Sequence, residues 1–169
     1  MFTSGNCKRP NARAMTASPL PVPIYLTGSI VDDDSDILVN LVSSHAYLNV
    51  GSSIAFSERW PTIVEDYAKA IRSERLDDGG CILLRRPDGG MWAALAVRSI
   101  HRKPSCRTWI SSALNGLSEV ARRAGARSIA MPPPGTSNGG QEWTYVNPRL
   151  LTPLAGFDLR IYVPALVHV

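Results

Sequence analysis

The chain has 169 residues, of which 44% are hydrophobic, and a net charge of +4, with a pI near 9.2 and a mean hydropathy of −0.04. These values are typical of one globular domain with a buried core. Its apolar runs fall short of the roughly 18 residues that a membrane-spanning helix needs, so we expect no membrane partner. The mildly basic balance fits an anionic ligand or weak affinity for nucleic acid, and it also fits an inert surface.

Three cysteines, Cys7, Cys81 and Cys106, form no CxxC pair and leave an odd number. This pattern argues for a reducing compartment and against a zinc site, so we expect a cytoplasmic protein without a metal or other cofactor. Residues Met1–Pro23 lack a hydrophobic period and are rich in Ser, Asn, Pro and basic side chains, which predicts a flexible tail without the apolar segment of a secretory signal. The basic residues of this tail either contact phosphate groups or are simply solvated.

The folded part is expected to begin with a short strand at Ile24–Thr27, followed by the acidic cluster Asp32–Asp36. The cluster lacks the Gly and Glu positions of an EF-hand loop, so a solvated turn is favoured over a cation site. The next segment, Ile37–Val42, is almost entirely apolar and rich in β-branched residues, as is typical of a strand buried on both faces. Asn40 within it therefore needs a hydrogen-bond partner, either from the backbone or from a ligand.

Two helical segments follow, one from Ile54 and one that begins with Pro61 as its first residue. A β-hairpin is predicted next, because two apolar strands at Cys81–Arg86 and Met91–Val97 are joined by a Pro-Asp-Gly-Gly turn. The hairpin strands would therefore be antiparallel neighbours within the sheet.

The clearest helix spans Thr108–Gly125, where apolar residues recur at spacings of three and four, and Ser105 is a candidate N-cap. The remaining elements are a strand at Ser128–Met131, a helix over Trp143–Leu154 and a final strand at Leu159–Val163. Strands alternate with helices, one crossover contains the hairpin, and the sequence shows neither an internal repeat nor a second domain. We therefore predict an α/β fold with three layers, α/β/α, in which a mixed sheet is flanked by helices.

A glycine-rich segment, Met131–Trp143, connects the fifth predicted strand to the last helix. Its small residues let backbone N–H groups approach a ligand, and the start of the helix adds a positive dipole end. The segment is either an anion cradle, best suited to phosphate or pyrophosphate, or a plain connector. Because ligands in such folds bind beyond the carboxyl ends of the strands, we expect Pro134–Gln141 to meet the loops at Ser43–Ser53 and Arg98–Ser105 in one cleft.

The order of these motifs resembles that of a macro domain. The resemblance lies in Gly28–Ile30, Ile37–Asn40 and Gly51–Ala55 for the first half, and in Arg127–Pro133 and Gly135–Gly140 for the second. It covers nearly the whole ordered chain and is most specific toward the DNA ADP-ribosylglycohydrolase antitoxins and the related terminal ADP-ribose glycohydrolases. It implies a macro domain over residues 24–169 that binds ADP-ribose or an ADP-ribosylated protein or nucleic acid.

The resemblance also implies a set of site residues. Asn40, a candidate catalytic residue, would face the distal ribose. Gly51–Ile54 would line one side of the diphosphate, and Gly135–Gly140 would supply backbone N–H donors from the other side. The full set of implied ligand contacts, besides Asn40, is Ser29, Ile30, Ser43, Gly51, Ser52, Ser53, Ile54, Pro134, Gly135, Thr136, Ser137, Asn138, Gly139 and Gly140.

Three departures from the family pattern bear on activity. Macro domains usually carry an Asp that accepts from the adenine amino group where this chain has Ser29, a weaker neutral partner for which Asp32 or Asp33 could substitute. The antitoxin-like hydrolases carry a lysine where this chain has Arg98, and arginine cannot lose a proton to act as base or nucleophile. Ser52 stands where a lysine often follows the glycine. Arg98 would then bind phosphate or stabilise negative charge, and a water activated by the substrate phosphate would remain the route to hydrolysis.

Three functions are therefore compatible with the sequence. The first is a macro domain that binds ADP-ribose, with weak or altered hydrolysis. The second is an active ADP-ribosylglycohydrolase that acts on DNA or protein, with Arg98 clamping the substrate. The third is a nucleic-acid- or partner-binding module that has lost nucleotide recognition and uses its basic tail for contacts.

Overall fold

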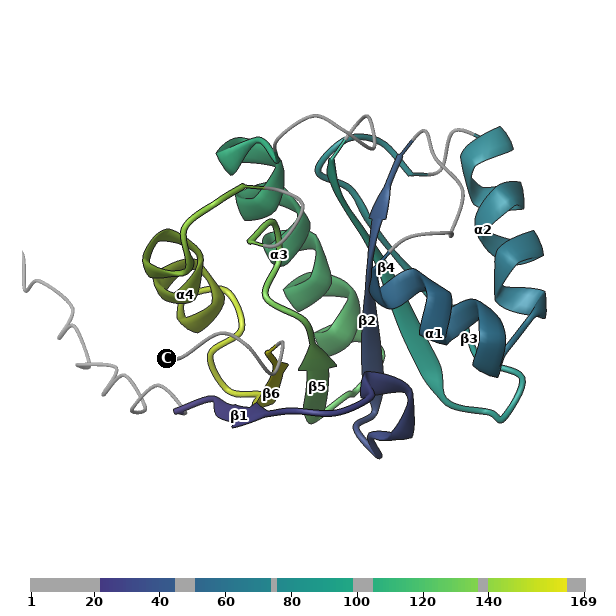
Figure 1. Cartoon of the computed structure of the whole chain (residues 1–169), viewed down its shortest axis with the longest axis horizontal. Coiled ribbons are helices and arrows are strands. Elements are labelled where there is room, and N and C mark those ends of the chain that lie inside the picture. The colour runs from purple at the N-terminus through teal and green to yellow at the C-terminus, as the bar shows by residue number, and fades with distance from the viewer. Residues whose placement is uncertain (1–21, 45–50, 74–75, 99–104, 137–139, 164–169) are drawn as a thin grey trace, which may run out of the picture.

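The computed structural model of the chain describes residues 22–44, 51–73, 76–98, 105–136 and 140–163. Strands and helices alternate along these ranges, apart from the consecutive helices α1 and α2 and the hairpin of β3 and β4 (Figure 1). The strands are β1 Ile24–Leu26, β2 Ile37–Ser43, β3 Cys81–Arg85, β4 Met91–Arg98, β5 Ser128–Met131 and β6 Asp158–Tyr162. The helices are the short 3-10 helix η1 Ile30–Asp32 and the α-helices α1 Ser52–Arg59, α2 Thr62–Arg72, α3 Arg107–Arg123 and α4 Trp143–Leu151.

The strands form one mixed sheet in the order β1-β6-β5-β2-β4-β3. Each neighbouring pair is parallel except β3 and β4, which form the predicted antiparallel hairpin. The turn of this hairpin is closed by a hydrogen bond from the backbone N–H of Arg86 to the carbonyl of Gly90, at 2.8 Å. Because the parallel strands point the same way, the segments that follow β1, β2, β4, β5 and β6 meet at one edge of the sheet.

Helices cover both faces of the sheet, α1 and α2 on one side and α3 and α4 on the other (Figure 1). Side chains of β2 alternate between these layers, as the two-residue period of a strand requires. Leu38 and Val42 pack into the core under α1 and α2, whereas Ile37 and Val39 pack into the core under α3 and α4. The predicted three-layer α/β/α fold with a mixed sheet is thereby confirmed.

The structure corrects four predicted helix boundaries. The helix α1 already begins at Ser52, and Pro61 precedes α2 instead of being its first residue. The N-cap position of α3 is occupied by Cys106, so Ser105 is not the cap. The helix α4 ends at Leu151, short of the predicted end. Helix ends depend on which turn packs against the sheet, and that cannot be seen in a sequence period.

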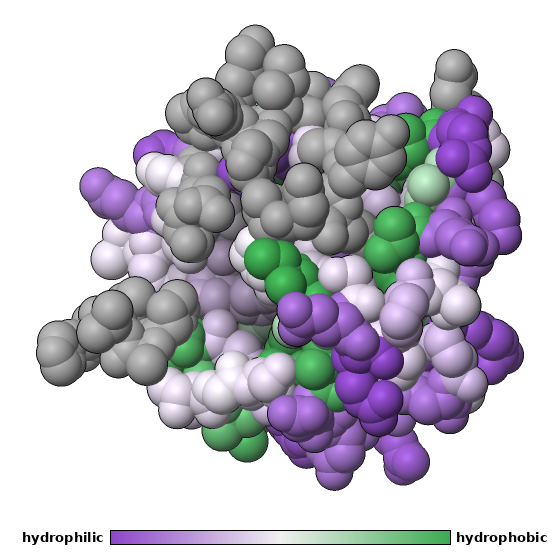
Figure 2. Space-filling model, turned by 45° about the vertical axis from the view of Figure 1, so that its right-hand side comes forward, coloured by the Kyte–Doolittle hydropathy of each residue, from purple (hydrophilic) through white to green (hydrophobic). Residues whose placement is uncertain are grey.

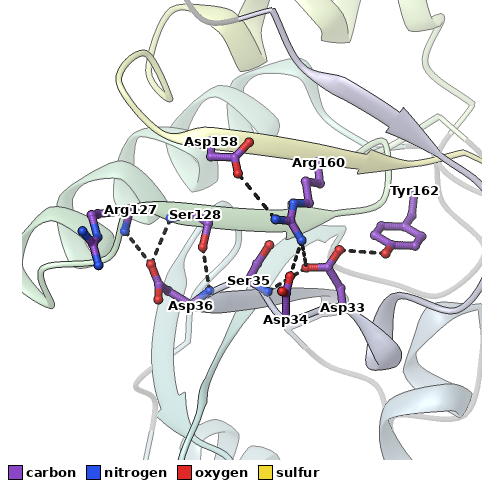
Figure 3. A network of polar contacts seen from close by, with 9 residues as sticks. All are labelled: Asp33, Asp34, Ser35, Asp36, Arg127, Ser128, Asp158, Arg160 and Tyr162. Carbon is purple, nitrogen blue, oxygen red and sulfur yellow. Dashed lines mark hydrogen bonds and ion pairs between the residues drawn. The ribbon is translucent and has the colours of Figure 1, made fainter.

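The acidic cluster Asp32–Asp36 is only partly the solvated turn that the sequence suggested: Asp32, Asp34 and Asp36 are exposed, but the cluster is also bonded to β5 and β6 (Figure 3). Asp36 accepts hydrogen bonds from the backbone N–H groups of Arg127 and Ser128 at 2.7 and 3.1 Å. The side chain of Asp33 is only 2% exposed and pairs with Arg160 of β6. The prediction was incomplete because the partners lie on β5 and β6, more than ninety residues further along the chain.

Large hydrophobic side chains are mostly internal, and among the described residues the exposed ones are Val22, Ile24 and Ile54. On the face shown in Figure 2, hydrophobic residues form small separate patches among hydrophilic ones. Within the described ranges, no helix has both the length and the apolar character to cross a membrane.

Candidate functional site

A cleft of about 520 Å³ opens where the parallel strands end. Its volume lies within the range of about 300–1,000 Å³ that is typical of small-molecule sites, and its place follows the rule that α/β sheets bind ligands beyond their carboxyl edge. The lining residues come from the ends of the parallel strands and from the start of α1: Gly28, Ser29, Ile30, Leu41, Gly51, Ser52, Ala55, Arg98, Pro132, Pro133, Thr136, Tyr162 and Val163.

The start of α1 forms one wall of the cleft and is anchored to β2. Gly51 precedes the helix with φ of 59° and ψ of −138°, a conformation that side chains other than glycine's disfavour. The first N–H groups of an α-helix have no acceptor within the helix and lie at its positive end. Beneath this turn, the Asn40 amide oxygen accepts hydrogen bonds from the Ser53 hydroxyl at 2.9 Å and from the Ser52 hydroxyl at 3.5 Å.

Arg98 supplies positive charge at the β4 side of the cleft. It is the last residue of β4, pairs in register with Ser43 of β2, and is half-buried. Burial lowers the pKa of Arg98 because desolvation disfavours the charged form, but a guanidinium stays protonated in proteins. Among the described lining residues it is the only charged one, so the cleft favours an anionic ligand.

Tyr162 lies at the β6 side of the cleft, and its hydroxyl donates to Asp33 Oδ2 at 2.7 Å (Figure 3). Burial and this hydrogen bond to a carboxylate raise the pKa of Tyr162 to about 12, so the phenol is neutral at physiological pH. In the sheet order, β6 and β4 are separated by β5 and β2, and three inter-strand spacings amount to about 14 Å. The neutral aromatic side and the cationic side are therefore well apart, which suits an elongated ligand.

The described lining provides binding groups and lacks an obvious catalyst. Its titratable side chains are Arg98 and Tyr162, and neither is a base at neutral pH. The hydroxyls of Ser29, Ser52 and Thr136, together with backbone groups, offer hydrogen bonds to phosphate or sugar. Within the ranges that the structure describes, this arrangement can bind and orient an anion, but it offers no side chain suited to general acid–base catalysis.

The structure brings six of the predicted site residues to the cleft: Ser29, Ile30, Gly51, Ser52, Arg98 and Thr136. The predicted contacts Ser137, Asn138 and Gly139 lie outside the described residues. The other predicted contacts are not among the residues that line the cleft.

The expected contact of Asn40 with a ribose stays a prediction, because its buried amide nitrogen has no hydrogen-bond partner among the described residues. Asn40 lies inside β2 and is fully buried. Its amide oxygen accepts a hydrogen bond from the hydroxyl of Ser53, which is only 2% exposed. Ser43 is also buried, and its carbonyl accepts a hydrogen bond from the Tyr67 hydroxyl. These polar residues therefore fasten β2 to the helices above it. Ile54 is 44% exposed and lies outside the cleft lining.

The glycine-rich loop after β5 meets the loop before α3 as predicted, but its first residues pack inward. Pro134 and Gly135 are buried, and a Cβ at Gly135 would lie 2.6 Å from Ile110 Cδ1. The side-chain amide of Gln141 donates to the Ser105 carbonyl at 2.7 Å and so joins the two loops. Gly135 is thus required by packing, and it is Thr136 that reaches the cleft. Gly140 is exposed and is not among the lining residues.

Seven lining residues were not among the predicted contacts: Gly28, Leu41, Ala55, Pro132, Pro133, Tyr162 and Val163. Gly28, Pro132 and Pro133 belong to the motifs that carry the macro domain resemblance. A signal for Tyr162 and Val163 was present, because they end the last predicted strand and so reach the same sheet edge as the other loops. Leu41 and Ala55 are apolar residues inside a strand and a helix, and nothing in the sequence distinguishes them from core residues.

Comparison with known proteins gives the class of this fold. No family model matches the sequence. The macrodomain of Mycobacterium tuberculosis DarG superposes with a TM-score of 0.75 at 26% identity, covering 85% of this chain and 97% of that one. The structure of Thermosipho africanus DarTG in complex with ADP-ribose gives a TM-score of 0.80 at 18% identity over 89% of this chain and 44% of that one. The chain therefore has the fold of a macro domain.

Its sequence relatives share one name. The DNA ADP-ribosyl glycohydrolase of Mycobacterium tuberculosis is 29% identical over 147 residues, which is 83% of this chain. The sequence similarity is therefore to proteins named DNA ADP-ribosyl glycohydrolase. The chain spans only 42% of the length of that relative.

Proposed function

We propose that this macro domain binds ADP-ribose, free or attached to a protein or nucleic acid, through the cleft at the carboxyl edge of the sheet. The observation that carries the proposal is the separation of two unlike sides in one cleft. Arg98 and the first turn of α1 form a side suited to phosphate groups. Tyr162 and Ile30 form a neutral side, about 14 Å from Arg98 by strand spacing, that suits a base.

The relatives support the same ligand. A neighbour of the same fold is a complex with ADP-ribose, and the sequence relatives carry the name DNA ADP-ribosyl glycohydrolase. We propose that residues 24–169 form the macro domain and that Met1–Pro23 form a basic tail.

Isothermal titration calorimetry with ADP-ribose tests the binding proposal. We expect binding in the wild type and a loss of about 10- to 100-fold in affinity for Arg98→Ala, because a charge-assisted hydrogen bond contributes about 1.5–3 kcal/mol. Exposed Arg123, on the last turn of α3 and not among the cleft residues, gives the matched control Arg123→Ala, which should bind like the wild type. Affinity weaker than about 1 mM in the wild type would overturn the proposal.

Hydrolysis is the second part of the proposal, and we expect it to be weak or to follow altered chemistry. Arg98 cannot provide a base, and Tyr162 holds its proton until a pH of about 12. The name of the relatives favours the alternative of an active glycohydrolase. Incubation with ADP-ribosylated single-stranded DNA and with ADP-ribosylated protein, at high enzyme concentration, separates the two. Release of ADP-ribose at rates that turn over many substrates per enzyme would support the alternative.

Arg98→Lys is the sharpest variant for this question. A lysine at this half-buried position can lose its proton, so a lysine-dependent route predicts a gain of hydrolysis over the wild type. Unchanged release of ADP-ribose by this variant would show that the position is not catalytic in this chain.

Three finer proposals concern context. We propose contact with nucleic acid through the basic residues of Met1–Pro23, for which deletion of this segment should weaken DNA binding and flatten its salt dependence. We also propose a cytoplasmic location, since the cysteine pattern fits a reducing compartment, and an antitoxin-like role. Cell fractionation and growth rescue by co-expression with a DNA-modifying ADP-ribosyltransferase test these two.

A further inference from the structure

A network of polar contacts joins the segment Asp33–Asp36 to β5 and β6 (Figure 3). The segment Asp33–Asp36 runs beside β5 and β6, from the cleft edge toward the start of β5. At the far end Asp36 binds the backbone of Arg127 and Ser128. At the near end Asp33 contacts Arg160 and Tyr162 of β6.

Every oxygen of the Asp33 carboxylate is engaged. Oδ1 accepts from the Ser35 backbone N–H at 2.7 Å and from Arg160 Nη1 at 3.2 Å. Oδ2 accepts from the Tyr162 hydroxyl at 2.7 Å. Burial alone would raise the pKa of Asp33, but the hydrogen bonds from Ser35 and Tyr162 and the charge of Arg160 lower it overall. The group is therefore a carboxylate at neutral pH and a strong acceptor for the phenol.

Tyr162 belongs both to this network and to the cleft. Its ring lines the cleft while its hydroxyl is bonded to Asp33. β6 has five residues, and its outer neighbour β1 has three, so few ladder hydrogen bonds hold this side of the sheet. Asp33 gives the aromatic side chain a second point of attachment, and a side chain that is already fixed loses less freedom when a ligand binds.

We propose that Asp33 is a positioning residue of the cleft, which holds the Tyr162 ring in place for the ligand and acts on ligand affinity only through Tyr162. The proposal rests on the proposed binding function. It also gives Asp33 of the acidic cluster a role. Asp33 cannot contact the ligand directly, because its side chain is 2% exposed and both its carboxylate oxygens already accept hydrogen bonds.

A double-mutant cycle on ADP-ribose affinity tests the proposal. Asp33→Ala and Tyr162→Phe each break the same hydrogen bond, and the second leaves the ring in place. We expect each to weaken ADP-ribose binding by about 3- to 10-fold, since freeing one side chain has an effect of this order. We expect the double variant to bind within about 2-fold of either single variant, because the two changes remove one interaction.

Asp34→Ala is the matched control. Asp34 also pairs with Arg160, but its side chain is 86% exposed and makes no described bond to Tyr162. It should bind ADP-ribose like the wild type. Asp33→Asn keeps an acceptor for the phenol, so it should recover part of the affinity lost in Asp33→Ala. The ADP-ribose affinity of each variant is measured well below its thermal midpoint, so that unfolding does not contribute to the difference.

The outcomes are distinguishable. Two results would overturn the positioning role and leave the binding function standing. In the first, the wild type binds and the affinity losses of the two single variants multiply in the double variant. In the second, Asp33→Ala binds ADP-ribose with unchanged affinity. A wild type that does not bind ADP-ribose would overturn the proposed function and this inference with it. A ligand-free readout adds to the cycle: the hydroxyl proton of Tyr162 should be visible by NMR in the wild type and lost to exchange in Asp33→Ala.

Discussion

Gly51→Ala tests whether the first turn of α1 depends on a backbone conformation that glycine alone adopts easily. Gly51 has φ of 59° and ψ of −138°, and no heavy atom of the described residues lies within 4 Å of the place that a Cβ would take. The substitution therefore introduces no clash with described atoms, and its effect isolates backbone strain, about 1–3 kcal/mol at such a conformation. We expect Gly51→Ala to lower the free energy of unfolding by an amount in this range.

The same substitution should weaken ADP-ribose binding, because relaxation of the strain would turn the N–H groups of Ser52 and Ser53 away from the cleft. Urea unfolding measures the stability, and calorimetry measures the affinity. For a domain of this size, each kcal/mol corresponds to a thermal midpoint lower by about 2–4 °C.

Gly125→Ala is the matched control for this experiment. Gly125 has φ of 71° and also has no heavy atom within 4 Å of an added Cβ, but it follows α3 and does not line the cleft. It should lose about 1–2 kcal/mol of stability and bind ADP-ribose like the wild type. A Gly51→Ala protein with wild-type stability and affinity would refute the reasoning, since α1 would then begin without the strained turn.

Three further predictions follow from buried or perturbed groups. Ser53→Ala removes the hydroxyl that binds the buried Asn40 at 2.9 Å and should lower the free energy of unfolding by about 1–3 kcal/mol in urea. A hydrogen bond from the backbone N–H of Arg127 lowers the pKa of Asp36 below its ordinary 3.8. Burial acts in the opposite direction, and hydrogen bonds from Ser128 lower the pKa further. The contribution of the Asp36 carboxylate to stability is therefore fully present above pH 3.8 and is lost as the pH falls through the folded-state pKa. The free energy of unfolding of Asp36→Asn should therefore fall less than that of the wild type between about pH 5 and pH 3. Finally, burial raises the pKa of Cys81 to about 12, whereas hydrogen bonds from Trp109 and Thr108 lower that of Cys106. Iodoacetamide followed by peptide mapping should label Cys106 well before Cys81 in the folded protein, and equal labelling would contradict these environments.

Local patterns predicted the elements of this fold well. The β-branched run at Ile37–Val42, the Pro-Asp-Gly-Gly turn and the apolar spacing of Thr108–Gly125 each report on neighbours within a few residues. The convergence of several loops at one sheet edge could also be foreseen, because parallel strands share a direction.

Side-chain roles in the site were harder to predict, because they depend on contacts distant in sequence. Asn40 was predicted to contact a ligand, and the sequence did not reveal that Ser53 binds its amide oxygen. Asp33 was predicted to be solvated, yet its side chain is buried and β6 supplies its partners. Gly135 looked like part of a phosphate loop, yet Ile110 leaves no room for any larger residue. In each case the deciding partner comes from another element of the fold.

The hydrogen-bond donors at the start of α1 are backbone N–H groups, and this affects how substitutions can change the site during evolution. A substitution that preserves the backbone at Gly51–Ser53 preserves these N–H groups, whatever side chain it installs. Catalytic side chains have no such protection, and one change of codon can remove them. A lineage can thus lose a catalytic side chain while these backbone donors survive.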